Sequence, residues 1–327
     1  MEPIYVVGDY RSEPSEGIQV VVKTLVDGVR SRGGAVTVVP PERLMHWLPR
    51  LVVRPPRHLV FVHGPGAGVV QASVVLRRLA STRIIWIGTR PDLGGVPRWA
   101  LGRRSAHVVI CNRVRADLKA VAPDAQLHEQ FIGIDPDRLA SSPGAEDPWP
   151  HLRDSGRPIA LHVGHLRRNR GLDLLTSAKQ SLSDRIEIVV QGSPTFPPDP
   201  GVVEELIEAG IHVRREYVPN LADLYRAADL YLFPARPELS GAIELPLGVL
   251  EALACGIPVL ANDFGALRSA LGEAQGVRLT DPQSFVDDLE AVLADRAWLE
   301  GSSPALPASL HAERVTDAVL AHTGGGI

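Results

Sequence analysis

The chain has 327 residues, of which 45% are hydrophobic and 22% charged, and its formal net charge is −4. At roughly 100 to 200 residues per domain this length predicts two domains, and the composition, with 30 Gly and 28 Pro, excludes disordered and fibrous proteins. The two distant cysteines, Cys111 and Cys255, indicate neither a disulfide framework nor a zinc site. No run approaches the roughly 18 apolar residues of a spanning helix, so we expect a cytoplasmic protein.

Short β-branched runs alternate with helical patterns along the first half of the chain, which is typical of a parallel sheet covered by helices on both faces. The clearest helix is Ile18–Arg32, where apolar residues return every three or four positions and two glycines follow. The predicted strands are Ile4–Val7, Ala35–Val39, His58–Val62, Arg83–Ile87, Val108–Cys111 and Gln126–Ile132.

Residues 140–157 are rich in Pro, Gly, Ser and charge and carry no period, so they indicate a linker. A second series of strands and helices follows. Its predicted strands are Pro158–Val163, Arg185–Gln191, His212–Glu216, Leu230–Phe233, Pro258–Ala261 and Val277–Leu279. Its predicted helices lie near 171–181, 201–209, 220–228, 246–255, 265–271 and 282–294, and a last helical pattern covers Pro307–His322.

The fold class is therefore α/β, with two Rossmann-like, doubly wound lobes and a cleft between them as the natural site. We place an N-terminal lobe at residues 1–145 and a C-terminal lobe at residues 155–305. A C-terminal helix, expected to pack back on the first lobe, occupies residues 306–327.

In open parallel sheets, ligands bind in the loops at the carboxyl ends of the strands. After the first strand, Gly17 lets N–H groups at a helix start approach a ligand, or it forms a simple turn. In the second lobe, the loop GHLRRNRG at 164–171 brings three arginines to a helix start. Guanidinium and free N–H groups favour a phosphate site, and the alternative is a solvated basic turn.

A later helix is framed by Pro246, which suits the first helical turn, and Gly256, which suits the C-terminal cap. Glu251 places a carboxylate in the middle of this otherwise apolar helix. Burial there is costly unless the carboxylate is exposed or meets ligand hydroxyls, and the sequence leaves both readings open.

Several stretches resemble motifs of retaining glycosyltransferases of the GT-B fold, specifically family 4. The resemblance spans nearly the whole chain and is strongest over residues 158–280. The matching stretches are Val163-Gly164-His165, Arg170-Gly171-Leu172-Asp173, Tyr217 to Leu230, Phe233-Pro234-Ala235 and Leu250 to Ala261, with weaker matches at Gly17-Ile18-Gln19 and Gly133-Ile134-Asp135.

Within the second lobe, the chain departs from the family pattern at two places. Where the family has Arg and Lys against the donor diphosphate, this chain has His165 and Arg170. The family's two glutamates lie eight residues apart, but the residue eight before Glu251 is Ile243, and an insertion displaces the motif. Glu244 and Glu238 are then the candidates for the first glutamate, and we favour Glu244.

The resemblance implies transfer of a hexose, with retention, from a UDP- or GDP-linked sugar to an acceptor hydroxyl, with a lipid-linked or phosphorylated acceptor as one option. It implies no cofactor and no metal. The catalytic residues would be Arg170, His165 and Glu244. The donor-binding residues would be Gly17, Gly164, Gly192, Val218, Glu238, Pro246, Leu247 and Glu251. The alternatives are a non-catalytic subunit that binds nucleotide sugar, motivated by His165 and the displaced glutamate, and another GT-B enzyme such as a nucleotide-sugar epimerase.

The charge is distributed unevenly, with 20 basic and 15 acidic residues in residues 1–154 against 14 and 23 in the remainder. The positive excess lies in residues 90–119. We expect Arg98, Arg103 and Arg104 there to face an anionic acceptor or the anionic inner face of a membrane, and the alternative is a solvated arginine-rich helix. The stretch lacks interleaved aromatics, which argues against nucleic acid as a partner.

Overall fold

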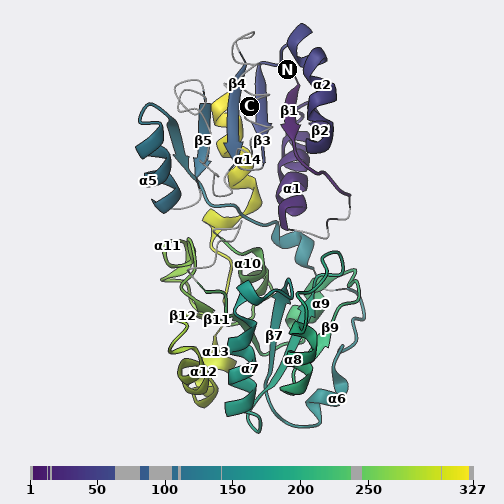
Figure 1. Ribbon diagram of the computed structural model, residues 1–327, viewed down its shortest axis with the longest axis vertical. Coiled ribbons are helices and arrows are strands. Elements are labelled where there is room, and N and C mark those ends of the chain that lie inside the picture. Colours follow the sequence, from purple (N-terminus) through teal and green to yellow (C-terminus); the bar gives the residue numbers. More distant parts are fainter. Residues whose placement is uncertain are drawn as a thin grey trace. The chain divides into compact units, whose positions relative to one another are not determined.

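The computed structural model describes residues 3–12, 14, 17–62, 82–87, 105–109, 112–140, 142–236, 245–302 and 304–323 (Figure 1). The chain forms two compact units. The first comprises Met1–Asp135, Ala242–Leu245 and Ala308–Ile327, and the second comprises Pro136–Gly241 and Pro246–Pro307.

The first unit is built on a parallel sheet in the order β2-β1-β3-β4-β5-β6. Its strands are β1 (Ile4–Val7), β2 (Val36–Val39), β3 (His58–Phe61), β4 (Arg83–Ile87), β5 (Ser105–Val109) and β6 (Gln126–Glu129). Its helices are α1 (Gly17–Ser31), η1 (Pro41–Arg43), α2 (Leu44–Val53), α5 (Asn112–Val121), η4 (Ala308–Leu310) and α14 (Ala312–Thr323).

Helix α2 covers one face of this sheet. Its Leu44 and Leu51 pack with Val7, Phe61 and Trp86 in one buried cluster. Side chains alternate along a strand, so the intervening buried residues of β1, β3 and β4 point to the opposite face. The sequence analysis did not single out α2, because Pro49 stands inside it and lacks the N–H of a helix interior.

The C-terminal helix α14 belongs to the first unit and lies against α1 (Figure 1). Gly28 of α1 lets the two helices approach closely, because a Cβ at this position would overlap the buried side chain of Thr316. Arg32 adds an ion pair to Asp317 at 2.9 Å. The last helical segment of the chain is therefore part of the core of the unit formed by the first residues.

The second unit contains a parallel sheet in the order β12-β11-β10-β7-β8-β9. Its strands are β7 (Ile159–Gly164), β8 (Glu187–Gly192), β9 (His212–Arg214), β10 (Leu230–Phe233), β11 (Val259–Asn262) and β12 (Val277–Thr280). Its helices are η2 (Pro136–Leu139), α6 (Pro150–Arg153), η3 (Arg168–Arg170), α7 (Leu172–Ser181), α8 (Val202–Glu208), α9 (Leu221–Arg226), α10 (Leu247–Ala254), α11 (Leu267–Leu271), α12 (Phe285–Ala294) and α13 (Arg296–Gly301).

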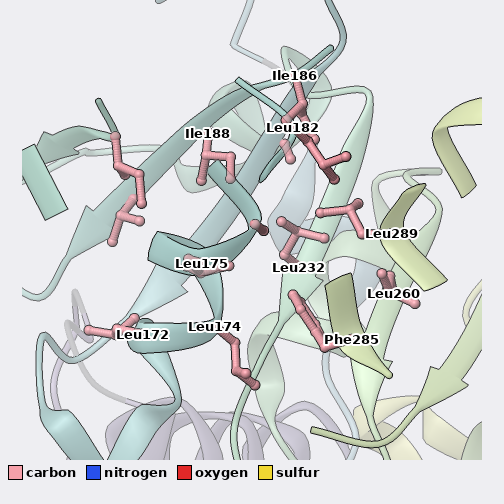
Figure 2. Packing of buried hydrophobic residues seen from close by; sticks show 14 of the residues in the cluster. Leu172, Leu174, Leu175, Leu182, Ile186, Ile188, Leu232, Leu260, Phe285 and Leu289 are labelled. Atoms are coloured by element: carbon pink, nitrogen blue, oxygen red, sulfur yellow. The ribbon is translucent and has the colours of Figure 1, made fainter. Parts of the chain in front are cut away.

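The core of the second unit lies between its sheet and helices α7 and α12. Figure 2 shows Leu175 of α7 and Phe285 and Leu289 of α12 among Ile188 and Leu232 of the strands. All five are fully buried. The near-continuous apolar strands of this sheet are what a sheet covered on both faces requires.

Residues 136–145, which the sequence analysis assigned to the first lobe, group with the second unit. Ser142 donates its backbone N–H and its hydroxyl to Asp223, at 3.0 and 2.7 Å, and Asn220 donates to the Ala140 carbonyl at 3.0 Å. The predicted linker contains the short helix α6, with Trp149 buried ahead of it. The segment is therefore fixed to the second unit by hydrogen bonds to α9 and its cap.

Two parallel sheets covered by helices confirm the predicted α/β, doubly wound class. Most predicted strands agree with the structure to within two residues. The exceptions are β5, which starts three residues earlier than predicted, and β6, which ends three residues earlier. Among the helices that the structure describes, none is long and apolar enough to cross a membrane.

Candidate functional site

The strand order of the second sheet reverses between β7 and β10. From β7 the chain builds outward to β8 and β9, and from β10 it builds in the other direction to β11 and β12. In open parallel sheets the carboxyl ends on either side of such a switch point hold the ligand. The loop after β7 and the segment after β10 are therefore the first places to look for a site.

Gly171 locks the loop after β7 against the end of β10. Its φ of 72° lies in the left-handed region, and a Cβ there would overlap the carbonyl oxygen of Pro234. Only glycine combines that backbone conformation with so close an approach. Asn262 of β11 donates a 2.7 Å hydrogen bond to the same Pro234 carbonyl. The position of η3, which Gly171 follows directly, is therefore fixed by contacts at the ends of β7, β10 and β11.

The two arginines of η3 differ sharply in what they contact. Exposed Arg168 forms a two-pronged ion pair with Glu205 of α8, at 2.6 and 3.0 Å. Half-buried Arg170 has no hydrogen-bond or ion-pair partner among the residues that the structure describes. Burial, with a smaller contribution from nearby Arg167, lowers the pKa of Arg170. A half-buried cation without a counter-charge is a good receptor for an anion.

His165 and Arg167 both lie against one aromatic ring. The imidazole of His165 is 4.7 Å from the ring of Phe196, and the guanidinium carbon of Arg167 is 5.7 Å from the same ring centre. Phe196 belongs to the loop after β8 and keeps 39% of its surface exposed. An aromatic face therefore orients two cation-forming side chains at the carboxyl edge of the sheet.

His162 lies next to the predicted donor-binding residue Gly164 and was not singled out in the sequence analysis. It is buried in β7 with Nδ1 3.0 Å from the Leu232 carbonyl, so Nδ1 donates and Nε2 is the unprotonated nitrogen. Among the residues that the structure describes, Nε2 has no hydrogen-bond partner, and it faces Gly164, where a Cβ would come within 2.9 Å. Burial lowers the pKa of His162 to about 4. A histidine inside an apolar strand was the available signal.

Glu251 is neither exposed nor dependent on a ligand for its partners. Only 6% exposed in α10, it accepts a hydrogen bond from Tyr225 at 2.9 Å and one from Arg138 of η2 at 2.8 Å. Burial and the neighbouring carboxylate raise the pKa of Tyr225, so its hydroxyl stays a donor. The buried carboxylate is therefore balanced within the protein by an ion pair and a hydrogen bond, partners that the sequence did not indicate.

The remaining predicted positions of the second unit lie around the same edge. Gly192 ends β8, where a Cβ would come within 2.8 Å of Leu166, and Val218 is half-buried in the loop after β9. The side chain of Gln191 links the end of β8 to the loop after β9, because it donates to the carbonyls of Gly192 and Glu216, both at 3.0 Å. Pro246 and Leu247 are buried at the start of α10.

Other predicted positions belong to the first unit or lie outside the described residues. Gly17 is the first residue of α1, which follows the carboxyl end of β1. Glu238, Glu244, Arg98, Arg103 and Arg104 lie outside the residues that the structure describes. Within the described ranges, no group of three or more His, Cys, Asp or Glu side chains is arranged to hold a metal ion.

Comparison with known proteins identifies the unit that carries this edge. Residues 157–295 match the model of the family described as glycosyl transferases group 1. The second unit is a glycosyl transferases group 1 domain. Its match includes η3, the switch point and α10, and it confirms the resemblance to glycosyltransferases.

Curated relatives extend the similarity but match only in part. The D-inositol 3-phosphate glycosyltransferase of Xylanimonas cellulosilytica is 34% identical over 150 residues, which are 42% of this chain and 34% of that protein. The enzyme of the same name from Rhodococcus erythropolis is 31% identical over 258 residues, 69% of this chain and 57% of that protein. The chain thus matches between about a third and three fifths of the length of these relatives.

The solved structure of Anabaena HepE in complex with UDP-glucose resembles the whole chain. Its TM-score is 0.72 at 13% identity, and the match covers 98% of this chain and 99% of that one. At such low identity the likeness shows the fold alone. The glycosyl transferases group 1 domain is therefore part of a GT-B fold, as predicted.

Proposed function

We propose that this protein is a retaining glycosyltransferase that moves a hexose from a UDP- or GDP-linked sugar to an acceptor hydroxyl without a metal. The observation that carries the proposal is Arg170, a half-buried guanidinium without a partner among the described residues, held at the switch point of the sheet. The similarity to HepE, whose structure was solved in complex with UDP-glucose, supports a nucleotide-sugar donor. The names of the curated relatives support a phosphorylated acceptor.

The chemical problem in this reaction is the negative charge that grows on the departing nucleoside diphosphate. Donors that are already in place when that charge develops lower the barrier most. Arg170 supplies a permanent positive charge, and His165, held against Phe196, supplies a second donor. The starts of α7 and α10, with Gly164 and Leu247 beside them, add free backbone N–H groups.

Glu251 fits the role of binding the donor ribose. Each carboxylate oxygen accepts one hydrogen bond from Arg138 or Tyr225, and each keeps a second lone pair for a ligand hydroxyl. Gly192 and Val218 would frame the base on the far side of the edge, Pro246 and Gly17 would line the donor, and Glu244 or Glu238 would contact the sugar.

The test is a matched pair of substitutions on η3, Arg170→Gln and Arg168→Gln. We expect UDP- or GDP-sugars to raise the melting temperature of the wild type and of Arg168→Gln but not of Arg170→Gln. Loss of a charge-assisted contact of about 2 to 3 kcal/mol weakens donor affinity roughly 30- to 150-fold. Transfer to an acceptor should fall with it.

Each other outcome has a definite reading. Arg170→Gln that binds donor as well as the wild type does would refute the assigned site. Donor binding without transfer or donor hydrolysis in the wild type would indicate the non-catalytic subunit instead. No stabilisation of the wild type by any nucleotide sugar would contradict both functions.

A further inference from the structure

Helix α2 of the first unit leaves an apolar stripe uncovered. Leu44 and Leu51 are buried against the sheet, whereas Met45 is 61% and Val53 78% exposed. Pro49, also exposed, lies between them at the same helical spacing, four residues from each. The stripe is thus a separate face of the helix, which no described part of the chain covers.

Basic side chains flank this stripe almost without opposing acids. Arg43, Arg50, Arg54 and Arg57 are exposed, and within the described part of the chain none of the four forms an ion pair. Residues 41–58 contain one acidic residue, Glu42. Many guanidinium groups elsewhere in the described part of the chain are paired, as Arg32 is with Asp317, whereas these four on and beside α2 are not.

A hollow on the same helix brings these groups together. It has a volume of about 480 Å³ and is lined by Arg43, His46, Trp47 and Arg50. Arg50 lies over the indole of Trp47, with 5.1 Å from the guanidinium carbon to the ring centre. The hollow therefore offers two guanidinium groups and an imidazole beside an aromatic wall, a combination that suits a phosphate group at an apolar boundary.

We propose that α2 docks the protein on an anionic lipid bilayer. Met45, Pro49 and Val53 enter the boundary between head groups and acyl chains, while Arg43, Arg50 and Arg54 contact lipid phosphates. A helix with an apolar stripe and an arginine-rich polar face binds such a surface through burial of the apolar side chains and through electrostatic attraction to the anionic lipids. At ten residues, roughly 15 Å, α2 lies on the bilayer and does not span it.

Charge complementarity and the apolar stripe together favour lipid over nucleic acid. The phosphate backbone of a nucleic acid would pair with the arginines but would leave Met45 and Val53 exposed to water. A bilayer satisfies both sets at once, because phosphates lie directly above the apolar layer. The proposal does not rest on the glycosyltransferase activity, since its residues all belong to the first unit.

The test is co-sedimentation of the full chain with vesicles of phosphatidylcholine alone or mixed with phosphatidylglycerol, at low and high salt. We expect binding only to the mixed vesicles, with salt weakening it. Arg43→Gln with Arg50→Gln should weaken binding about 25-fold, roughly fivefold for each charge. Met45→Ser with Val53→Ser keeps the net charge and should still weaken it at least about tenfold.

The matched control is Arg268→Gln with Arg296→Gln, which removes two exposed charges from the second unit and should bind like the wild type. Absence of binding to mixed vesicles, or equal loss in the control, would overturn the proposal. The proposal would also be overturned if Met45→Ser with Val53→Ser bound vesicles as the wild type does and the wild type bound DNA equally tightly. In that case α2 would recognise any polyanion. Circular dichroism checks that each variant is folded, and the salt and lipid dependence of the wild type needs no variant.

Discussion

At the scale of single residues, the predicted site residues differ in how their charge is balanced. Arg168 is neutralised by Glu205 and Glu251 by Arg138, while Arg170 has no such partner in the described part of the chain. The chemistry that remains available to a ligand is therefore concentrated on Arg170 and on spare lone pairs of Glu251. These pairings join residues 37 and 113 positions apart, so no local pattern in the sequence predicts them.

His162 makes the stability of the second unit depend on pH. Its pKa is about 4 in the folded protein against 6.5 when exposed, so the unfolded chain binds the proton more readily between these values. The stabilising effect of keeping the imidazole neutral is complete above pH 6.5 and is lost as pH falls toward 4. We expect this residue alone to lower the free energy of unfolding by about 3 kcal/mol over that window.

His162→Gln provides the comparison, because an amide also donates to the Leu232 carbonyl but does not titrate. Denaturant unfolding of both proteins from neutral to acidic pH measures the difference. The wild type should lose stability more steeply than the variant below pH 6.5. Parallel curves for the two proteins would contradict the assignment of a buried, neutral imidazole.

At the scale of elements, the sequence predicts where strands lie better than it predicts which elements contact one another. Apolar runs such as β1 and β10 are found with the bounds that their composition indicates. Helix α2 was not predicted, because Pro49 lacks the N–H of a helix interior, and the packing of Leu44 and Leu51 on the sheet is not visible in the sequence. The site loop was recognised from its arginines and glycines, but its anchoring to Pro234 depends on a strand 63 residues away in sequence and could not be read locally.

Gly171→Ala tests that anchoring. The substitution combines a left-handed φ with overlap on the Pro234 carbonyl, so we expect a loss of about 2 to 4 kcal/mol and weaker donor binding as η3 shifts. Gly256→Ala is the matched control, because its φ is 79° but a Cβ there meets nothing within 4 Å. It should cost only about 1 to 2 kcal/mol and leave donor binding intact. Equal costs for the two variants would show that the contact with Pro234 has no role.

At the scale of the whole molecule, each unit has a hydrophobic core of its own. One contains Phe61 stacked on Trp86 with ring centres 4.6 Å apart, and the other contains Phe285 and Leu289. Chains built in this way commonly depart from two-state unfolding. The proposed functional residues are divided in a similar way: apart from Gly17, the candidate donor-site residues belong to the second unit, and the proposed lipid-docking helix belongs to the first.

Calorimetry should therefore resolve two transitions that respond to different perturbations. Nucleotide sugar at a hundredfold excess over its Kd should stabilise the second unit by about 2.7 kcal/mol and raise its transition by several degrees. Gly28→Ala, which forces a Cβ into Thr316 of α14, should destabilise only the first unit, by about 1 to 3 kcal/mol, and lower the temperature of that unit's transition. A single transition that responds to both changes would mean that the two cores unfold together. If the nucleotide sugar instead raised the same transition that Gly28→Ala lowers, the assignment of the donor site to the second unit would be contradicted.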